Sequence, residues 1–350
     1  MNPVPDAGLR SGSAPIPPLT AHSLPWVDIH AHPGRCFLGR ARPVDTVGEP
    51  GELDQTARRT ADAIRAAGLA AVSYSSVSDL RVIGLNPAGG LTETRPFAPG
   101  EAVADHLRQL DRIASISAMC DLPIALTAAD VWAAHEQHRA SLLLMCEGAD
   151  FADDDLSLIA DAYDRGVRGI TIVHYRQNEF GDLQTEPPRY SGLSVKGAAL
   201  VAEMNRLGMI VDLAHASYET TCQAVAVSAD PMMISHTHLR LDDSDHPRLV
   251  TEAHASVVAR AGGLIGAWPS GVRSVTFKDF VDEVLRLVDL IGVEHVAIGT
   301  DMDANYRPVM TEYRQFHDLA DSLARHGMTD AEVDRVLGLN ALDLFKRVCG

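Results

Sequence analysis

The sequence predicts a single (β/α)8 barrel, and two observations lead to that fold class. Eight short apolar runs recur along the 350 residues. Stretches with the 3.6-residue period of amphipathic helices lie between them, as in residues 154–167 and 277–292. Strands that alternate with helices indicate βαβ units and a parallel sheet. A count of eight strands indicates that this sheet closes into a TIM barrel.

The predicted strands follow a short N-terminal segment. Residues 1–24 are rich in proline and small polar residues and are expected to form a flexible arm, whereas residues 25–350 are expected to form the barrel as one catalytic domain. The eight predicted strands are residues 25–32, 68–76, 141–148, 169–175, 209–215, 231–238, 263–270 and 295–303.

The segments that depart from this alternation are also interpretable. Residues 33–55 and 79–100 follow the first two strands and contain many Gly and Pro residues, so they are expected to cross the mouth of the barrel. Near the C-terminus, Thr329 and Glu332 have the spacing of a capping box. This spacing predicts a pair of helices that closes the domain.

Composition restricts the partners and the compartment. The net charge of −17 argues against nucleic acid and anionic membranes, because both are polyanions. No apolar stretch approaches the roughly 18–20 residues of a membrane span. The five cysteines are scattered and show no C-x-x-C spacing, which favours a soluble protein of the reducing cytoplasm. A small-molecule or peptide ligand is therefore expected.

Side chains that bind metals or transfer protons occur at the C-terminal ends of the predicted strands. In a (β/α)8 barrel these ends meet at one face, where active sites are built. Six strands therefore deliver seven such side chains to one cavity: His30, His32, Glu147, His174, His215, His236 and Asp301. The other histidines apart from His238, including His106 and His254, are expected on solvated helices or loops.

Each residue of this set also has a simpler explanation. The pair His30 and His32 shares one face of a strand, but such pairs also occur by chance. A lone histidine such as His215 can be a core residue bonded to the backbone. Glu147 is harder to explain in this way, because burying a carboxylate after an apolar run is costly without a cation. Independent accidents would not all select the same end of successive strands.

The combined set indicates a metal centre. Imidazoles with carboxylates suit Zn²⁺ or a comparable divalent ion, and more than four ligands permit two ions. The chain has only three lysines, none at a predicted strand end, so a carboxylated lysine cannot bridge the two ions. Glu147 is the anion available for that bridge.

Several stretches resemble the membrane (renal) dipeptidase family of the amidohydrolase superfamily. They occur in family order from residue 25 to 347: VDIHAH, CEGAD, TIVHY, GLSVKGAALVAEMNRLGMIVDLAHAS, PMMISHTH, DHPRLVTEAH, GGLIGAW, IGTDMDAN and GLNALDLF. The resemblance implies a metal-dependent hydrolase barrel with two zinc ions per chain. It also implies a dipeptide as substrate and, because the family is often dimeric, a second copy of the chain as a partner.

The resemblance assigns roles residue by residue. His30, His32 and Glu147 would bind the first metal, and Glu147, His215 and His236 would bind the second. His174 would contact the substrate and polarise its scissile carbonyl. Arg248 would pair with the terminal carboxylate of the substrate, a bidentate task suited to arginine. Asp301 would accept a proton from a water held between the metals and return it to the leaving amine.

The departure from the family pattern is at His32. Family members generally carry His-x-Asp in this strand, whereas this chain has His-x-His. A neutral imidazole in place of a carboxylate leaves the metal pair one unit more positive, which should acidify the bridging water and weaken metal retention.

Three functions fit the sequence. The first is a zinc dipeptidase that cleaves dipeptides with a free C-terminal carboxylate, including L-Xaa-D-Xaa, through a metal-bridging hydroxide. The second is an amidohydrolase that acts on another amide or lactone, such as an N-acyl amino acid. The third is a non-catalytic metal-binding protein of the same fold.

Overall fold

The computed structural model describes residues 24–38, 50–241 and 246–350, so residues 1–23 of the predicted arm lie outside the described residues. Eight strands form one sheet in the order β1-β2-β5-β6-β7-β8-β9-β10, and each neighbouring pair is parallel. They are β1 (Val27–Asp28), β2 (Ala71–Val77), β5 (Ser141–Glu147), β6 (Gly169–Thr171), β7 (Ile210–Asp212), β8 (Met233–Thr237), β9 (Leu264–Ala267) and β10 (Val296–Ile298). All eight predicted strands are confirmed.

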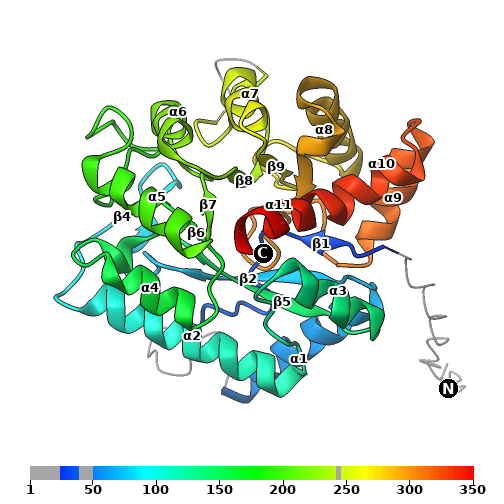
Figure 1. The fold of residues 1–350 in the computed structure, drawn as a ribbon, viewed down its shortest axis with the longest axis horizontal. Helices are drawn as coiled ribbons and strands as arrows, with labels where there is room; N and C mark the ends of the chain where they lie inside the picture. Colours follow the sequence, from blue (N-terminus) through cyan, green and yellow to red (C-terminus); the bar gives the residue numbers. More distant parts are fainter. Residues whose placement is uncertain (1–23, 39–49, 242–245) are drawn as a thin grey trace, which may run out of the picture.

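Hydrogen bonds between the first and last strands close the sheet into a barrel (Figure 1). The backbone N–H of Ile29 donates to the carbonyl of Ile298 at 3.0 Å, and the N–H of Asp301 donates to the carbonyl of His30 at 2.8 Å. Asp28 reinforces this seam, because its carboxylate accepts from both the hydroxyl and the backbone N–H of Thr300. The residues just after β1 and β10 are therefore held side by side.

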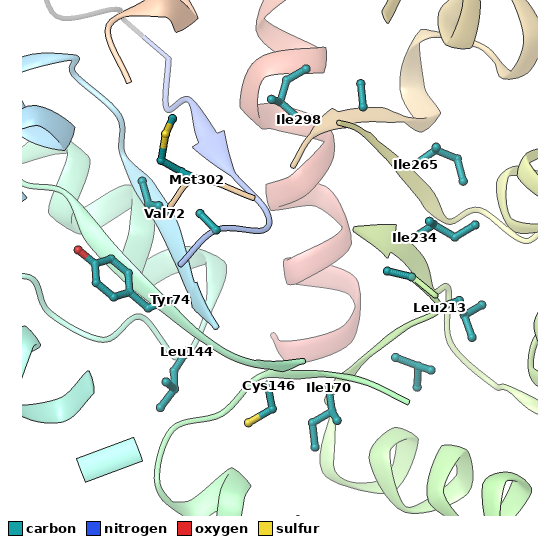
Figure 2. Packing of buried hydrophobic residues seen from close by; sticks show 14 of the residues in the cluster. Val72, Tyr74, Leu144, Cys146, Ile170, Leu213, Ile234, Ile265, Ile298 and Met302 are labelled. Atoms are coloured by element: carbon teal, nitrogen blue, oxygen red, sulfur yellow. The ribbon is translucent and has the colours of Figure 1, made fainter. Parts of the chain in front are cut away.

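The helices surround the barrel and cover the outward side chains of the strands (Figure 1). They are α1 (Pro50–Ala66), α2 (Glu101–Cys120), α3 (Ala128–Glu136), α4 (Ser157–Asp164), α5 (Val195–Leu207), α6 (Tyr218–Val227), α7 (Glu252–Arg260), α8 (Phe277–Ile291), α9 (Gln315–Arg325), α10 (Asp330–Asp334) and α11 (Asn340–Cys349). Figure 2 shows outward residues of successive strands, such as Val72, Leu144 and Ile234, in this buried layer. Because both faces of each strand are covered, the strands are apolar runs rather than alternating patterns.

The C-terminal segment closes one end of the barrel. The predicted capping box is present, since the hydroxyl of Thr329 accepts from the backbone N–H of Glu332 and the Glu332 carboxylate accepts from the Thr329 N–H. A π-helical turn over Arg335–Leu339 then leads into α11, which lies over the centre of the ring in Figure 1. Phe345 and Leu342 of α11 line an apolar cavity with the starts of the strands, including Met233. The opposite end of the barrel carries the polar residues.

The two predicted excursions are confirmed in part. Residues 79–100 contain a hairpin of β3 (Ile83–Leu85) and β4 (Leu91–Glu93). Its Thr92 hydroxyl donates to Glu186, in the loop that follows β6. The excursion over residues 33–55 ends earlier than predicted, because α1 begins at Pro50, and residues 39–49 lie outside the described residues. Within the described part of the chain, no helix combines the length and apolarity needed to cross a membrane.

Candidate metal centre

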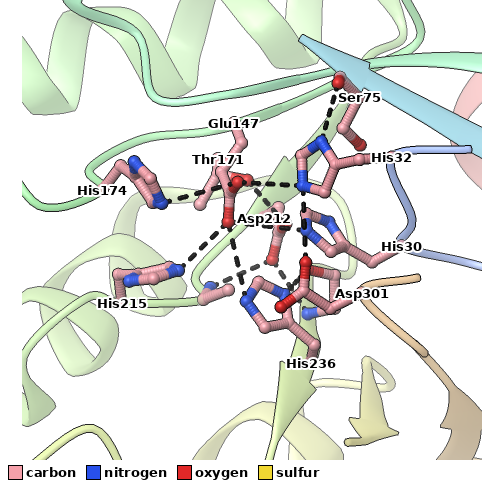
Figure 3. Close-up of polar contacts among 12 residues, drawn as sticks. His30, His32, Ser75, Glu147, Thr171, His174, Asp212, His215, His236 and Asp301 are labelled. Atoms are coloured by element: carbon pink, nitrogen blue, oxygen red, sulfur yellow. Dashed lines mark hydrogen bonds and ion pairs between the residues drawn. The ribbon is translucent and has the colours of Figure 1, made fainter. Parts of the chain in front are cut away.

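The structure brings the seven predicted strand-end residues together at the carboxyl end of the barrel (Figure 3). Glu147 is the last residue of β5 and His236 lies within β8, while the others stand two to four residues beyond the ends of their strands. All seven are at most 8% exposed: His30, His32, Glu147, His174, His215, His236 and Asp301. The predicted convergence of these residues is therefore present.

Glu147 stands at the centre of the group and five imidazoles face its carboxylate (Figure 3). Its Oε1 atom lies 3.1 Å from Nε2 of His215, 3.5 Å from Nε2 of His30 and 3.6 Å from Nε2 of His236. Its Oε2 atom lies 3.3 Å from Nε2 of His32 and 3.5 Å from Nε2 of His174. One carboxylate is thus shared among five histidines that come from four strands, β1, β6, β7 and β8.

The residues fit a metal centre. The Nε2 atoms of His30 and His32 are buried and have no hydrogen-bond partner among the described residues. Potential ligand atoms lie within 4.8 Å of one another in three groups: His30, His32 and Asp301; His30, Glu147 and His236; and Glu147, His174 and His215. Buried imidazole nitrogens without partners, directed at carboxylates, are the donor set that Zn²⁺ prefers.

The protonation states of His215 and His236 favour metal binding. Burial and the charge of Arg248 hold the pKa of His215 well below its usual range, and burial with the charge of His30 does the same to the pKa of His236. Both rings are therefore neutral near pH 7, which is the state that binds a metal. Burial opposes ionisation of Glu147, but the imidazoles of His174 and His30 outweigh it and hold the pKa of Glu147 well below its usual value.

Two other histidines, His174 and His32, lie between carboxylates, and their pKa values are raised instead. Burial opposes protonation of His174, but the charges of Asp79 and Glu147 outweigh it and raise the pKa of His174 to about 9. Burial is also outweighed at His32, where the neighbouring Cys36 and Glu147 raise the pKa well above its usual value. A cation must compete with a proton for the Nε2 atom of His32.

Asp301 faces His32 from the other side of the seam. Its Oδ1 atom lies 3.5 Å from Nε2 of His32, and its Oδ2 atom accepts a hydrogen bond from the Trp268 indole at 3.3 Å. Burial raises the pKa of Asp301 to about 6, although His32 and His30 oppose the shift. The backbone of Asp301 has a φ of 54°, in the left-handed region. A carboxyl group with a pKa near 6 can both accept and donate a proton near neutral pH.

Arg248 is buried beside this group without a neutralising partner. Its Nη1 donates to the Gln184 side-chain oxygen at 3.0 Å, and its Nη2 donates to the carbonyl of His236 at 3.1 Å. Its Nε atom has no hydrogen-bond partner, and no carboxylate of the described residues lies within ion-pair distance of its guanidinium. A buried cation without an anion is costly, so this arrangement favours a negatively charged ligand.

The sequence interpretation did not identify the residues that hold the histidines in place. Asp79, wholly buried, lies 2.7 Å from Nδ1 of His174 through its Oδ1 atom. The carbonyl of Ser75 lies 2.9 Å from Nδ1 of His32. Asp79 follows β2 by two residues, so the signal that identified the other strand ends was present there too. The backbone contact of Ser75 leaves no signal in the side-chain pattern.

Two histidines expected in solvent are buried instead. The His106 ring stacks on Phe151 with centroids 3.7 Å apart. The Nε2 atom of His254 lies 2.7 Å from the hydroxyl of Thr221. That prediction was wrong for both, because amphipathic periodicity places a residue on a helix face but does not say how large a neighbour covers that face.

Comparison with known proteins identifies dipeptidases as relatives of this chain. The sequence profile of the membrane dipeptidase family (peptidase family M19) matches residues 58–349. A dipeptidase of Clonostachys rogersoniana is 30% identical over 234 residues, which cover 65% of this chain and 60% of that protein. A dipeptidase of Aspergillus oryzae is 31% identical over 264 residues, which cover 71% of this chain and 62% of that protein. The chain thus spans about three fifths of the length of these curated relatives.

Solved structures share the fold. A metallopeptidase described as a dipeptidase of family M19 matches with a TM-score of 0.78 at 20% identity, over 93% of this chain and 99% of that chain. A metallopeptidase from Rhodobacter sphaeroides, solved with a phosphinate mimic of the dipeptide L-Ala-D-Ala, matches with a TM-score of 0.77 at 18% identity, over 93% of this chain and 99% of that chain. At these identities the likeness establishes the (β/α)8 barrel.

Proposed function

Because the chain belongs to the membrane dipeptidase family, peptidase family M19, we propose that it is a zinc-dependent dipeptidase for dipeptides with a free C-terminal carboxylate. One observation carries the proposal: a carboxylate surrounded by five buried imidazoles lies beside a buried arginine that has no ion-pair partner among the described residues. The first part suits a pair of divalent ions and the second suits a substrate anion.

His30, His32 and Glu147 would hold the first ion, and Glu147, His215 and His236 would hold the second. The short distances from both Glu147 oxygens to these rings support a shared carboxylate. When bound, the two ions would supply Lewis acidity to the peptide carbonyl and to the attacking water. The protein residues would then bind the substrate, orient it and move the proton.

Arg248 would bind the terminal carboxylate of the dipeptide. Gln184 and the carbonyl of His236 occupy its two terminal nitrogens in part, and these neutral acceptors leave the positive charge available. An anion fixed at this position places the adjacent peptide bond at a set distance from the metal ligands, which selects the C-terminal peptide bond of the substrate for cleavage. The position of the guanidinium is itself fixed, because the side chain is 1% exposed.

His174 and Asp301 would act on the scissile bond from opposite sides of Glu147. His174 would donate a hydrogen bond to the carbonyl oxygen as negative charge develops there. Asp301 would accept a proton from the attacking water and return it to the leaving amine. Its pKa of about 6 suits both transfers near neutral pH.

L-Xaa-D-Xaa dipeptides are the substrates we propose first. The Rhodobacter sphaeroides metallopeptidase of the same fold was solved with a mimic of L-Ala-D-Ala. Fixing the C-terminal end of the substrate through its carboxylate leaves the configuration of the last residue unconstrained by Arg248. An N-acyl amino acid has the same carboxylate and an amide bond, so it is the alternative substrate that this site also accommodates.

The test combines metal content with a substrate panel. Protein purified without added metal is analysed for bound metals and assayed with L-Ala-D-Ala, L-Ala-L-Ala, the C-terminal amide of L-Ala-D-Ala and N-acetyl-alanine. Two zinc ions per chain with turnover of the free dipeptides alone is the expected result. Turnover of N-acetyl-alanine in preference to the dipeptides would identify the alternative activity. Bound metal without any turnover would indicate a non-catalytic metal-binding protein.

A further inference from the structure

A buried carboxylate behind His174 has no place in the function described above. Asp79 lies in the turn after β2 and is 0% exposed. Its Oδ1 atom lies 2.7 Å from Nδ1 of His174. Its Oδ2 atom accepts the backbone N–H groups of Tyr175 at 3.0 Å and Arg176 at 2.9 Å. Both oxygens of Asp79 are thus used on His174 and the two residues that follow it.

The segment that carries His174 needs this support. His174 stands three residues beyond the end of β6, so no strand pairing holds its backbone. One further clamp is present, because the side-chain amide of Asn178 donates to the carbonyl of Ile172 at 2.8 Å. The Asn178 clamp fixes the course of the chain, but of the two clamps only Asp79 contacts the ring itself.

The carboxylate of Asp79 determines which nitrogen of the His174 ring is left to face the substrate. An ionised carboxylate only accepts hydrogen bonds, so the Nδ1 atom of His174 carries a hydrogen and donates it to Asp79. The Nε2 atom then faces Oε2 of Glu147, 3.5 Å away, on the side where the substrate would lie. The contact therefore engages the Nδ1 hydrogen and sets the plane of the ring, so that the protonated ring donates toward the substrate through Nε2.

Among the described residues, the Asp79 carboxylate forms no ion pair with a lysine or arginine that would compete with His174 for its negative charge. The guanidinium of Arg176, whose backbone N–H bonds to Asp79, pairs with Asp150 at 2.9 Å and with Asp153 at 2.6 Å. Among the described residues, only backbone N–H groups and the His174 ring bind the Asp79 carboxylate.

From these contacts we infer that Asp79 is a positioning residue, which holds the His174 ring so that its Nε2 atom meets the scissile carbonyl. This inference rests on the role proposed for His174 and deepens it. Removal of an orienting partner behind an active-site histidine typically costs on the order of 10–100-fold in activity. The loss should fall on kcat, with KM nearly unchanged, because the substrate anion is bound by Arg248.

Asp79→Asn is the informative substitution. Asparagine has one acceptor oxygen and one donor nitrogen, so it cannot accept from both Nδ1–H and the two backbone N–H groups. We expect a decrease in kcat of roughly 10–100-fold with unchanged zinc content. In a His174→Ala background the same substitution should have no further effect, because Asp79 acts through the ring that has been removed.

A matched control separates positioning from general stability. Asp105 is also a buried carboxylate near the end of β2, but it binds Arg81, Arg108 and Gln109 and no histidine. Asp105→Asn should lower Tm, and its effect on kcat should be the same with and without His174. If Asp79→Asn also lowers kcat equally in both backgrounds, Asp79 acts through the fold and the inference is wrong.

A spectroscopic measurement tests the inference without any assay of activity. In zinc-loaded protein labelled with ¹⁵N-histidine, the resonances that disappear in His174→Ala belong to His174. We expect them to show a hydrogen on Nδ1 that is strongly downfield and that is lost or shifted in Asp79→Asn. A His174 ring without a hydrogen on Nδ1 in the wild-type protein would overturn the inference, even if the dipeptidase activity is real. An inactive protein with the expected Nδ1–H would instead contradict the proposed function alone.

Discussion

The Nε2 atom of His32 lies 3.3 Å from Oε2 of Glu147, so a histidine after β1 directly faces the carboxylate at the end of β5. The resemblance to the family implies an aspartate at the position of His32. An aspartate there would place two carboxylates against each other in a buried site, which is favourable only with a cation between them. The histidine at position 32 therefore affects the stability of the metal-free protein as well as the binding of metal.

His32→Asp should destabilise the metal-free protein and strengthen zinc binding. The new carboxylate would lie near both Glu147 and Asp301, so like charges repel until a cation or a proton is bound. We expect a lower Tm without metal, a larger rise in Tm on zinc addition, and zinc binding on the order of tenfold tighter, or about 1.4 kcal/mol. Calorimetric titration and thermal unfolding measure both. An unchanged Tm of the metal-free variant would show that a carboxylate at position 32 is not repelled by Glu147 and Asp301.

Arg248→Ala should impair dipeptide binding more than the chemical step. Loss of one partner of a buried, hydrogen-bonded charge pair costs roughly 2–5 kcal/mol, so KM should rise about 30-fold or more. The control substrate is the C-terminal amide of the dipeptide, which lacks the carboxylate and should be equally poor with both proteins. A wild-type KM in Arg248→Ala would assign the terminal carboxylate to another residue.

His254 should make the protein acid-sensitive. Burial lowers the pKa of His254 to about 4, whereas the ring has its ordinary value of about 6.5 when unfolded. Between these values the unfolded chain binds a proton that the folded chain does not, so stability falls as the pH decreases from 6.5 to 4. The difference corresponds to on the order of 3 kcal/mol.

The measurement for His254 is Tm against pH for the wild type and His254→Gln. Glutamine can still bond to the Thr221 hydroxyl but does not titrate, so the variant should lose less Tm below pH 6.5. Burial also lowers the pKa of His106 to about 4, so part of the slope should remain in the variant. Parallel curves for the two proteins would mean that His254 is not the group responsible.

Phe345→Ala should destabilise the barrel without altering the site. Phe345 is 3% exposed and lines the cavity between α11 and the strand starts. Truncation of a buried phenylalanine costs about 3–5 kcal/mol. Because the cavity lies at the end of the barrel opposite to Glu147, KM and kcat of the remaining folded protein should stay at wild-type values. Chemical denaturation and steady-state kinetics on the same preparation test both parts.

The fold and the core of the site were predictable because they depend on local patterns. The apolar runs predicted all eight strands. The rule that active sites lie at the carboxyl ends of barrel strands predicted that His30 and Asp301 would meet, although 270 residues lie between them. Asp79 was missed because several serines between Ser73 and Ser78 precede it. It therefore does not stand out as a polar residue after an apolar strand.

The surroundings of individual side chains were less predictable. Nothing in the sequence says that the carbonyl of Ser75 faces His32, or that Gln184, in the loop after β6, accepts a hydrogen bond from Arg248. Such contacts depend on how loops of unequal length pack, and a one-dimensional pattern does not contain that information. His106 and His254 illustrate the same point, since their helix positions gave no sign of the neighbours that bury them.

The seam between β1 and β10 has a consequence for how the protein is made. The N–H of Asp301 closes onto the carbonyl of His30, so the side of the centre that carries His30 is synthesised well before the side that carries Asp301. α11 (Asn340–Cys349), which covers the opposite end of the barrel, is synthesised after both of these residues. Domains of this kind complete their folding only when the last elements emerge. The proposed metal centre should therefore close only after β10 has been made, and a nascent chain halted before β10 is expected to retain no zinc.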